Sequence, residues 1–122
     1  VQKTLPEDCA ITAAFVDILP GKHSVPCYPF PGLVINFNVA TRIHKDIGDD
    51  NFCISVAFAN CDGGDLCLVE PGIRCRARSG DVFAFRSSKT SHFNLDYVGK
   101  RMSFVLHTER SGKYWVESRN GW

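Results

Sequence analysis

Short strand patterns and turns alternate through residues 62–86, which read DGGDLCLVEPGIRCRARSGDVFAFR. Runs typical of β-strands occupy 65–69, 73–78 and 81–86. The turn signals between them are Asp62-Gly63-Gly64, Glu70-Pro71-Gly72 and Ser79-Gly80. Strands this short and this closely spaced favour an antiparallel sandwich or jelly roll over alternating strands and helices.

The same pattern continues on both sides of this stretch. We expect further strands at Leu33–Ile43, Phe52–Ala59, His92–Tyr97 and Arg101–Thr108, and a last short one at Lys113–Glu117. Residues 12–19 fit a strand or a short helix, and four prolines then block regular structure before Gly32. The sequence predicts one mainly β domain over 1–122, with little helix. Residues 1–31 would form a Pro-rich support segment that holds any helix, and 32–117 the β core.

Composition narrows the class of protein further. No apolar run approaches the roughly 18 residues of a membrane span, so we expect no membrane contact. Residues 1–73 hold four Lys/Arg against nine Asp/Glu, a balance of −5, and residues 74–122 hold ten against four, a balance of +6. The basic half includes Arg74, Arg76 and Arg78. Their alternation with other residues predicts that one face of this strand is exposed to solvent. This asymmetry fits either an anionic ligand or two ordinary solvated faces.

The chain has six cysteines, at positions 9, 27, 53, 61, 67 and 75. They form no C-x-x-C pair, and no basic-then-apolar leader opens the chain. We therefore expect free thiols in a reducing, intracellular compartment, either nuclear or cytoplasmic. A secreted, disulfide-bonded roll is the alternative, and counting free thiols on denatured protein separates the two.

A candidate metal site begins at His44-Lys45-Asp46, at the end of the predicted strand 33–43. In extended backbone, residues i and i+2 point the same way, so an imidazole and a carboxylate would share one face. His92, which opens a later strand, is the natural third ligand. Two histidines and one carboxylate with open positions form the facial triad of non-haem Fe(II) oxygenases. The open positions would admit a cosubstrate and O₂.

Arg101 lies nine residues after His92, just past Gly99 and at the start of a strand. A guanidinium fork suits the remote end of a dicarboxylate, and Ser103 on the same face would add a hydroxyl. A surface charge at a turn is the alternative for Arg101. Asn36 and Asn38 alternate onto one face of the strand leading to the triad, where they would either contact the cosubstrate or be ordinary polar strand positions.

Five sequence blocks resemble the double-stranded β-helix of 2-oxoglutarate/Fe(II) dioxygenases, most closely the TET/JBP-like branch found in fungi. In chain order they are HKDIGDDNFC, GGDLCLVEPG, SGDVFAFRSS, SHFN and GKRMSFVLHT. The resemblance covers residues 32–108. It implies a cupin-like jelly roll in which His44, Asp46 and His92 bind Fe(II), and Arg101, with Ser103, anchors 2-oxoglutarate.

The resemblance also implies a substrate. Asp49 falls where TET-like enzymes place a polar residue that contacts the target cytosine, and His107 falls where they carry an aromatic that stacks on the base. The expected reaction is hydroxylation of a methylated base, 5-methylcytosine, in nucleic acid, which leads to DNA demethylation. A protein side chain or a small metabolite is an alternative substrate. The alternative outside the enzymes is a binding module, a β-roll that keeps the metal site but catalyses no reaction.

Overall fold

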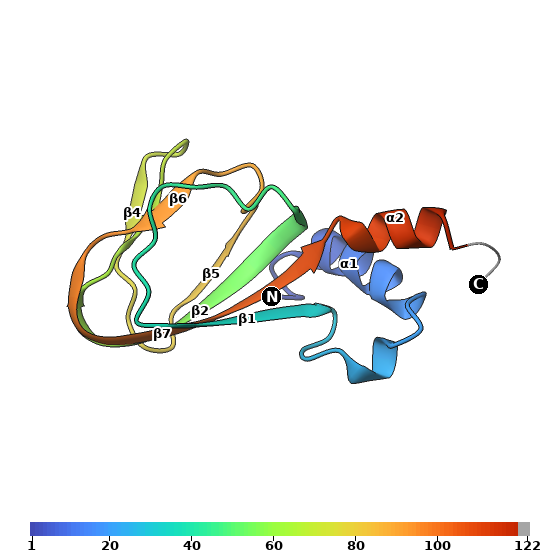
Figure 1. The fold of residues 1–122 in the computed structure, drawn as a ribbon, viewed down its shortest axis with the longest axis horizontal. Helices are drawn as coiled ribbons and strands as arrows, with labels where there is room; N and C mark the ends of the chain where they lie inside the picture. Colours follow the sequence, from blue (N-terminus) through green and yellow to red (C-terminus); the bar gives the residue numbers. More distant parts are fainter. Residues whose placement is uncertain (120–122) are drawn as a thin grey trace.

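Two antiparallel sheets face each other, and the helices gather at one end of them (Figure 1). This computed structural model describes residues 1–119. The larger sheet has the order β1-β7-β2-β5 and the smaller one β4-β3-β6. The elements are α1 (Pro6–Asp17), η1 (Lys22–Ser24), β1 (Gly32–Phe37), β2 (Asp49–Gly63), β3 (Leu66–Leu68), β4 (Ile73–Cys75), β5 (Val82–Phe85), β6 (His92–Asn94), β7 (Tyr97–Glu109) and α2 (Ser111–Glu117). The mainly β, double-stranded β-helix architecture predicted from the sequence is confirmed.

The larger sheet has two different faces because successive strand residues point to opposite sides. On β2, Cys53, Ser55 and Ala57 line a cavity between the sheets. Phe52 and Ile54, on the other face of β2, belong to an apolar core with Cys9 of α1 and Phe30. One strand therefore supplies the cavity wall and the hydrophobic core at once.

Helix α1 covers one end of the outer face of this sheet. Pro6 stands at its start, where the missing N–H costs no hydrogen bond. Cys9, Thr12 and Val16 are its buried residues and are spaced as one helical stripe. These contacts settle the ambiguity over residues 12–19: the helix begins six residues earlier, at Pro6, and runs to Asp17.

A β-bulge in β2 ties α1 to the sheet. The register with β7 shifts between Asp50 and Ile54, and Asn51 lies there with φ of 59°. Its side-chain Nδ2 donates to the Asp8 carbonyl at 3.1 Å and to Thr12 Oγ1 at 3.2 Å. The bulged residue therefore supplies polar contacts beside the apolar core.

The predicted strand 33–43 is wrong beyond Phe37. Asn38 takes a left-handed backbone conformation, with φ of 50°, and this turns the chain out of the strand. It is held there by Arg101, because its N–H donates to the Arg101 carbonyl at 2.7 Å and its Oδ1 accepts from the Arg101 N–H at 2.9 Å. The chain then leaves the sheet and crosses the roll as a loop over residues 38–48 (Figure 1).

The predicted last strand at Lys113–Glu117 is also wrong, because these residues belong to α2. Gly112 packs so closely on Phe15 of α1 that an added Cβ would lie 2.2 Å from its Cζ. Lys113 pairs with Asp50 at 2.7 Å. Contacts with α1 and β2 thus override the local alternation of strand-forming residues.

The remaining expectations differ from the structure mainly in their boundaries. β2 and β7 are longer than predicted, whereas β3, β4, β5 and β6 are shorter. Strand β4 ends at Cys75, yet Arg74, Arg76 and Arg78 remain exposed on either side of Cys75 and the buried Ala77. The structure has all six cysteines as free thiols. Among residues 1–119, no helix has the length and apolar character needed to cross a membrane.

Because the core lies beneath α1, we expect alanine substitution to lower the free energy of unfolding by unequal amounts at two phenylalanines on the same face of β2. Phe52 is 3% exposed and packs edge-to-face on Phe30 at 5.3 Å, whereas Phe58 is 38% exposed. We expect Phe52→Ala to lower the free energy of unfolding by about 3–5 kcal/mol. Phe58→Ala serves as the matched control and should cost about 1–2 kcal/mol. Urea unfolding measures both, and equal costs would contradict this position of the core.

Candidate metal centre and the adjoining cavity

A cavity of about 400 Å³ lies between the two sheets. The larger sheet contributes Arg101, Ser103 and His107 of β7 to its wall, and the smaller sheet contributes His92 of β6. The crossing loop closes one side and contributes His44 and Asp46, so most of the site residues predicted from sequence meet here. The residues in this set are Asn36, His44, Asp46, Asp49, His92, Arg101, Ser103 and His107.

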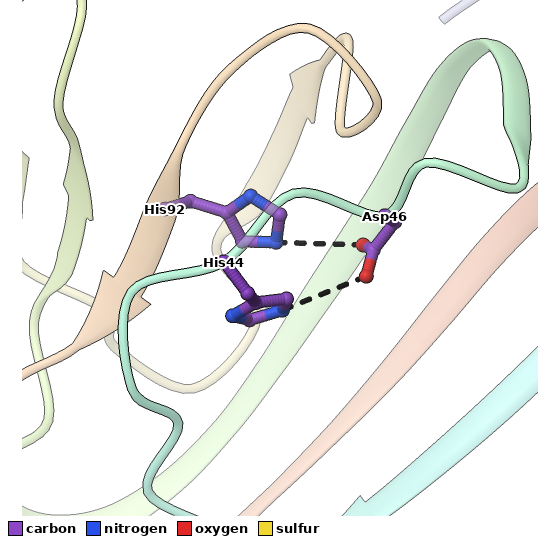
Figure 2. A group of neighbouring side chains, drawn as sticks. All are labelled: His44, Asp46 and His92. Atoms are coloured by element: carbon purple, nitrogen blue, oxygen red, sulfur yellow. Dashed lines mark ion pairs between the residues drawn. The ribbon is translucent and has the colours of Figure 1, made fainter.

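His44, Asp46 and His92, which all line this cavity, point toward one another (Figure 2). Asp46 Oδ1 lies 3.5 Å from His44 Nε2, and Asp46 Oδ2 lies 3.4 Å from His92 Nε2. One ligand atom from each residue lies within 4.8 Å of the others. Their side chains combine two imidazole nitrogens with one carboxylate, a donor set suited to a divalent first-row metal.

Backbone hydrogen bonds, rather than a continuous strand, bring the three together. His44 N–H donates to the His92 carbonyl at 3.1 Å, and His92 N–H donates to the His44 carbonyl at 2.9 Å. Asp46 N–H donates to the Ser87 carbonyl at 3.1 Å. The predicted convergence of His44 and Asp46 is therefore observed, but it arises in a loop that is pinned to β6.

In each histidine, the ring nitrogen that points away from Asp46 is hydrogen-bonded to a backbone carbonyl. His44 Nδ1 lies 2.7 Å from the Arg42 carbonyl, and His92 Nδ1 lies 2.9 Å from the Thr90 carbonyl. A carbonyl only accepts, so we assign the proton to Nδ1 in both rings. When a ring is neutral, Nε2 then carries the lone pair, which is the tautomer that a metal ligand requires.

Electrostatics favour a charged carboxylate at the centre. The hydrogen bond from His92 outweighs partial burial and lowers the pKa of Asp46, with help from the nearby imidazoles. Burial works to lower the pKa of His92, but hydrogen bonds to Asp46 and the Thr90 carbonyl outweigh it, and the pKa is raised. The carboxylate of Asp46 is therefore held in its charged form, which is the form that binds a cation.

Arg101 and Ser103 reach the cavity from β7 with unused hydrogen-bonding capacity. Arg101 Nη1 donates to the Val39 carbonyl at 3.2 Å, but its buried Nε has no acceptor within the described residues. Ser103 is 5% exposed, and its Oγ accepts from Asn36 Nδ2 at 3.3 Å. An unpaired buried donor is costly, so this wall of the cavity is suited to an anionic group.

The two asparagines do not share a face, contrary to the prediction, because β1 ends between them. Asn36 lines the cavity beside Ser103. Asn38 does not line it; instead it holds the backbone of Arg101. A contact between Asn36 and a cosubstrate stays a prediction.

Asp49 and His107 form a pair farther along the same cavity. Asp49 Oδ1 lies 3.2 Å from His107 Nδ1, and Asp49 Oδ2 accepts from Ser87 Oγ at 2.6 Å. The His107 ring lies over Gly32, where an added Cβ would be 2.5 Å from Nε2, so only glycine leaves room for the ring. Asp49 and His107 are therefore positioned by each other, by Ser87 and by the close approach of Gly32.

Sequence reasoning missed three residues of this site. Ser87 is 1% exposed and joins Asp46 to Asp49, but nothing in the FRSS run marks it as a site residue. Asn94 lines the cavity two residues after His92, and this strand spacing was a usable signal. Cys53 also lines it, and burial raises the pKa of its thiol to about 11, so it stays neutral.

No protein-family model matches the chain, and no curated protein matches it. Among solved structures, it is similar to NgTET1 in complex with 5mC DNA, with a TM-score of 0.74 and 18% sequence identity. The match covers 84% of this chain and 43% of that one, so the chain spans less than half of that neighbour's length. The chain therefore has a TET-like fold, as the resemblance implied, although the fungal branch stays a prediction.

Proposed function

We propose that this chain is an Fe(II)- and 2-oxoglutarate-dependent dioxygenase. One observation carries the proposal: a His-Asp-His cluster opens onto the same cavity as Arg101, whose buried Nε has no acceptor among residues 1–119. Non-haem Fe(II) oxygenases use such a facial triad, and a dicarboxylate cosubstrate calls for an arginine fork nearby. The TET-like fold of the chain supports the proposal.

The residues present fit the metal. His44 and His92 would each bind through Nε2, because Nδ1 is occupied by a backbone carbonyl, and Asp46 would bind through one carboxylate oxygen. The Arg42 and Thr90 carbonyls orient the two rings, as outer partners of metal-binding histidines commonly do. The cluster retains a carboxylate, and this favours hydroxylation over halogenation.

The residues also fit 2-oxoglutarate. Arg101 would bind the distal carboxylate through Nε and its second terminal nitrogen, while Ser103 donates its hydroxyl hydrogen. When bound, Fe(II), 2-oxoglutarate and O₂ supply the oxidation, in which the cosubstrate becomes succinate and CO₂ and the substrate gains a hydroxyl group. The chain's own residues orient the cosubstrate and exclude water around it.

Arg101→Lys tests the anchor, because lysine keeps the charge but loses the planar fork. We expect 2-oxoglutarate to bind the Mn(II)-loaded variant about tenfold or more weakly, as measured by calorimetric titration under nitrogen. Arg76→Lys, at an exposed position, is the control and should bind as the unmodified protein does. Equal affinities for all three proteins would show that Arg101 is not the anchor.

The substrate we propose is a methylated base, 5-methylcytosine, in nucleic acid. The solved neighbour was crystallised with 5mC DNA, and Asp49 and His107 line the cavity of this chain together. A carboxylate can accept from the exocyclic amine of cytosine, and an imidazole ring can stack on a base. Such an enzyme would act in the nucleus or cytoplasm. A protein side chain or metabolite remains the competing substrate.

Succinate release distinguishes these substrates. We expect oligonucleotides containing 5-methylcytosine to raise the rate above that with the same sequence unmethylated, and mass spectrometry of the product to show an added oxygen. Single- and double-stranded forms should be compared, because a base in a duplex must first leave the stack. Equal rates of succinate release with methylated and unmethylated oligonucleotides would contradict the proposed substrate. They would not contradict the proposed oxygenase chemistry.

A further inference from the structure

The turn between β3 and β4 carries a glutamate whose carboxylate reaches outside its own hairpin. Gly72 N–H donates to the Val69 carbonyl at 3.0 Å and closes the turn around Glu70. Glu70 Oε2 accepts from the Ser91 backbone N–H at 2.7 Å, and Oε1 accepts from Ser91 Oγ at 2.8 Å. The same Oε1 lies 3.1 Å from Lys45 Nζ. One carboxylate therefore has three donors from two separate segments.

Both partners of Glu70 are immediate neighbours of the candidate metal ligands. Ser91 precedes His92 on the way into β6, and Lys45 lies between His44 and Asp46 in the crossing loop. Val69 N–H also donates to the Ser91 carbonyl at 2.9 Å. The turn thus contacts the segments that carry all three ligands.

The crossing loop needs such a support, because within residues 1–119 its one β-bridge is the isolated bridge between His44 and His92. An exposed ion pair alone contributes little to stability. Glu70 does more than pair with Lys45, since it also accepts from a backbone N–H, and hydrogen bonds to a charged group are the stronger ones. The hydrogen bond from the Ser91 hydroxyl is the main cause that lowers the pKa of Glu70 to about 2. The carboxylate therefore stays charged at every pH at which a histidine can bind a metal.

We propose that Glu70 is a positioning residue for the His44–Asp46–His92 cluster: it holds the crossing loop and the start of β6 together so that the three ligand atoms converge. This inference rests on the proposed function, because positioning matters only if the cluster binds a metal. It extends the site to the Glu70-Pro71-Gly72 turn, which lies outside the cavity wall. Outer partners that orient ligands commonly change metal affinity by about 10–100-fold.

Glu70→Ala tests the proposal through metal affinity. We expect Co(II), titrated without oxygen and followed by its visible absorption, to bind about tenfold more weakly, while the thermal midpoint of the metal-free protein changes little. Glu70→Gln keeps an acceptor for Ser91 but loses the charge, so its affinity should be intermediate. Glu7→Ala, which removes an exposed glutamate of α1, is the control. Unchanged Co(II) affinity in Glu70→Ala would overturn the proposal.

Lys45→Met separates the contact of Glu70 with Lys45 from its contact with Ser91. Alone it should weaken Co(II) binding slightly, and in the Glu70→Ala background it should have no further effect, because its partner is already gone. Additive effects would show that Lys45 and Glu70 act independently, and would contradict the proposal that they hold the crossing loop together as a pair. If Glu70→Ala does not fold, Lys45→Met and Ser91→Ala provide the same comparison.

Hydrogen exchange of the His44 and His92 amides in the metal-free protein tests the geometry directly. We expect faster exchange in Glu70→Ala, since these amides bond to each other's carbonyls across the two segments. A loss of Co(II) affinity with unchanged exchange would point to a charge effect and overturn positioning. If the unmodified protein binds no divalent metal, the proposed function fails, whereas the exchange rates still decide whether Glu70 holds the segments together.

Discussion

The two hydrogen bonds between the backbones of His44 and His92 are the constraint on which the site depends. They pin the crossing loop to the first residue of β6, and so bring together His44 and His92, which lie 48 residues apart in the chain. The ring positions follow, because each Nδ1 then meets a carbonyl two residues earlier, at Arg42 and Thr90. With this bridge in place, both imidazoles lie beside Asp46.

The pleat of the larger sheet supplies the rest of the chemistry. Alternate residues of β7 face the cavity, so Arg101, Ser103 and His107 share one wall, while the intervening residues, among them Leu106, pack toward α1 or solvent. Asn38 joins the two arrangements: its left-handed backbone starts the crossing loop, and its side chain holds the Arg101 backbone. The loop that carries His44 and Asp46 and the cavity wall that carries Arg101 thus meet at one residue.

Local patterns were enough to predict the β architecture and most strand positions, because strand alternation and turn residues are short-range signals. The choice of His44, Asp46 and His92 as candidate ligands rested mainly on the position of Arg101 and on the resemblance to TET/JBP-like dioxygenases. Local patterns failed where distant contacts decide the structure. Nothing near Asn38 reveals that Arg101 holds it in a turn, and the strand-like run at Lys113–Glu117 becomes helical against α1. Ser87 and Glu70 join the site through partners tens of residues away, so their roles become visible only once the fold is known.

Anaerobic addition of Fe(II) and 2-oxoglutarate, followed in the visible spectrum, tests the central claim most directly. A cosubstrate chelated to iron in this site should produce a weak charge-transfer band that requires both components and disappears in Asp46→Ala, which loses the only carboxylate of the cluster. The account predicts that band, saturating at one iron per chain. Its absence at saturating concentrations of both, in folded protein, would contradict the assignment of this cavity as an oxygenase site.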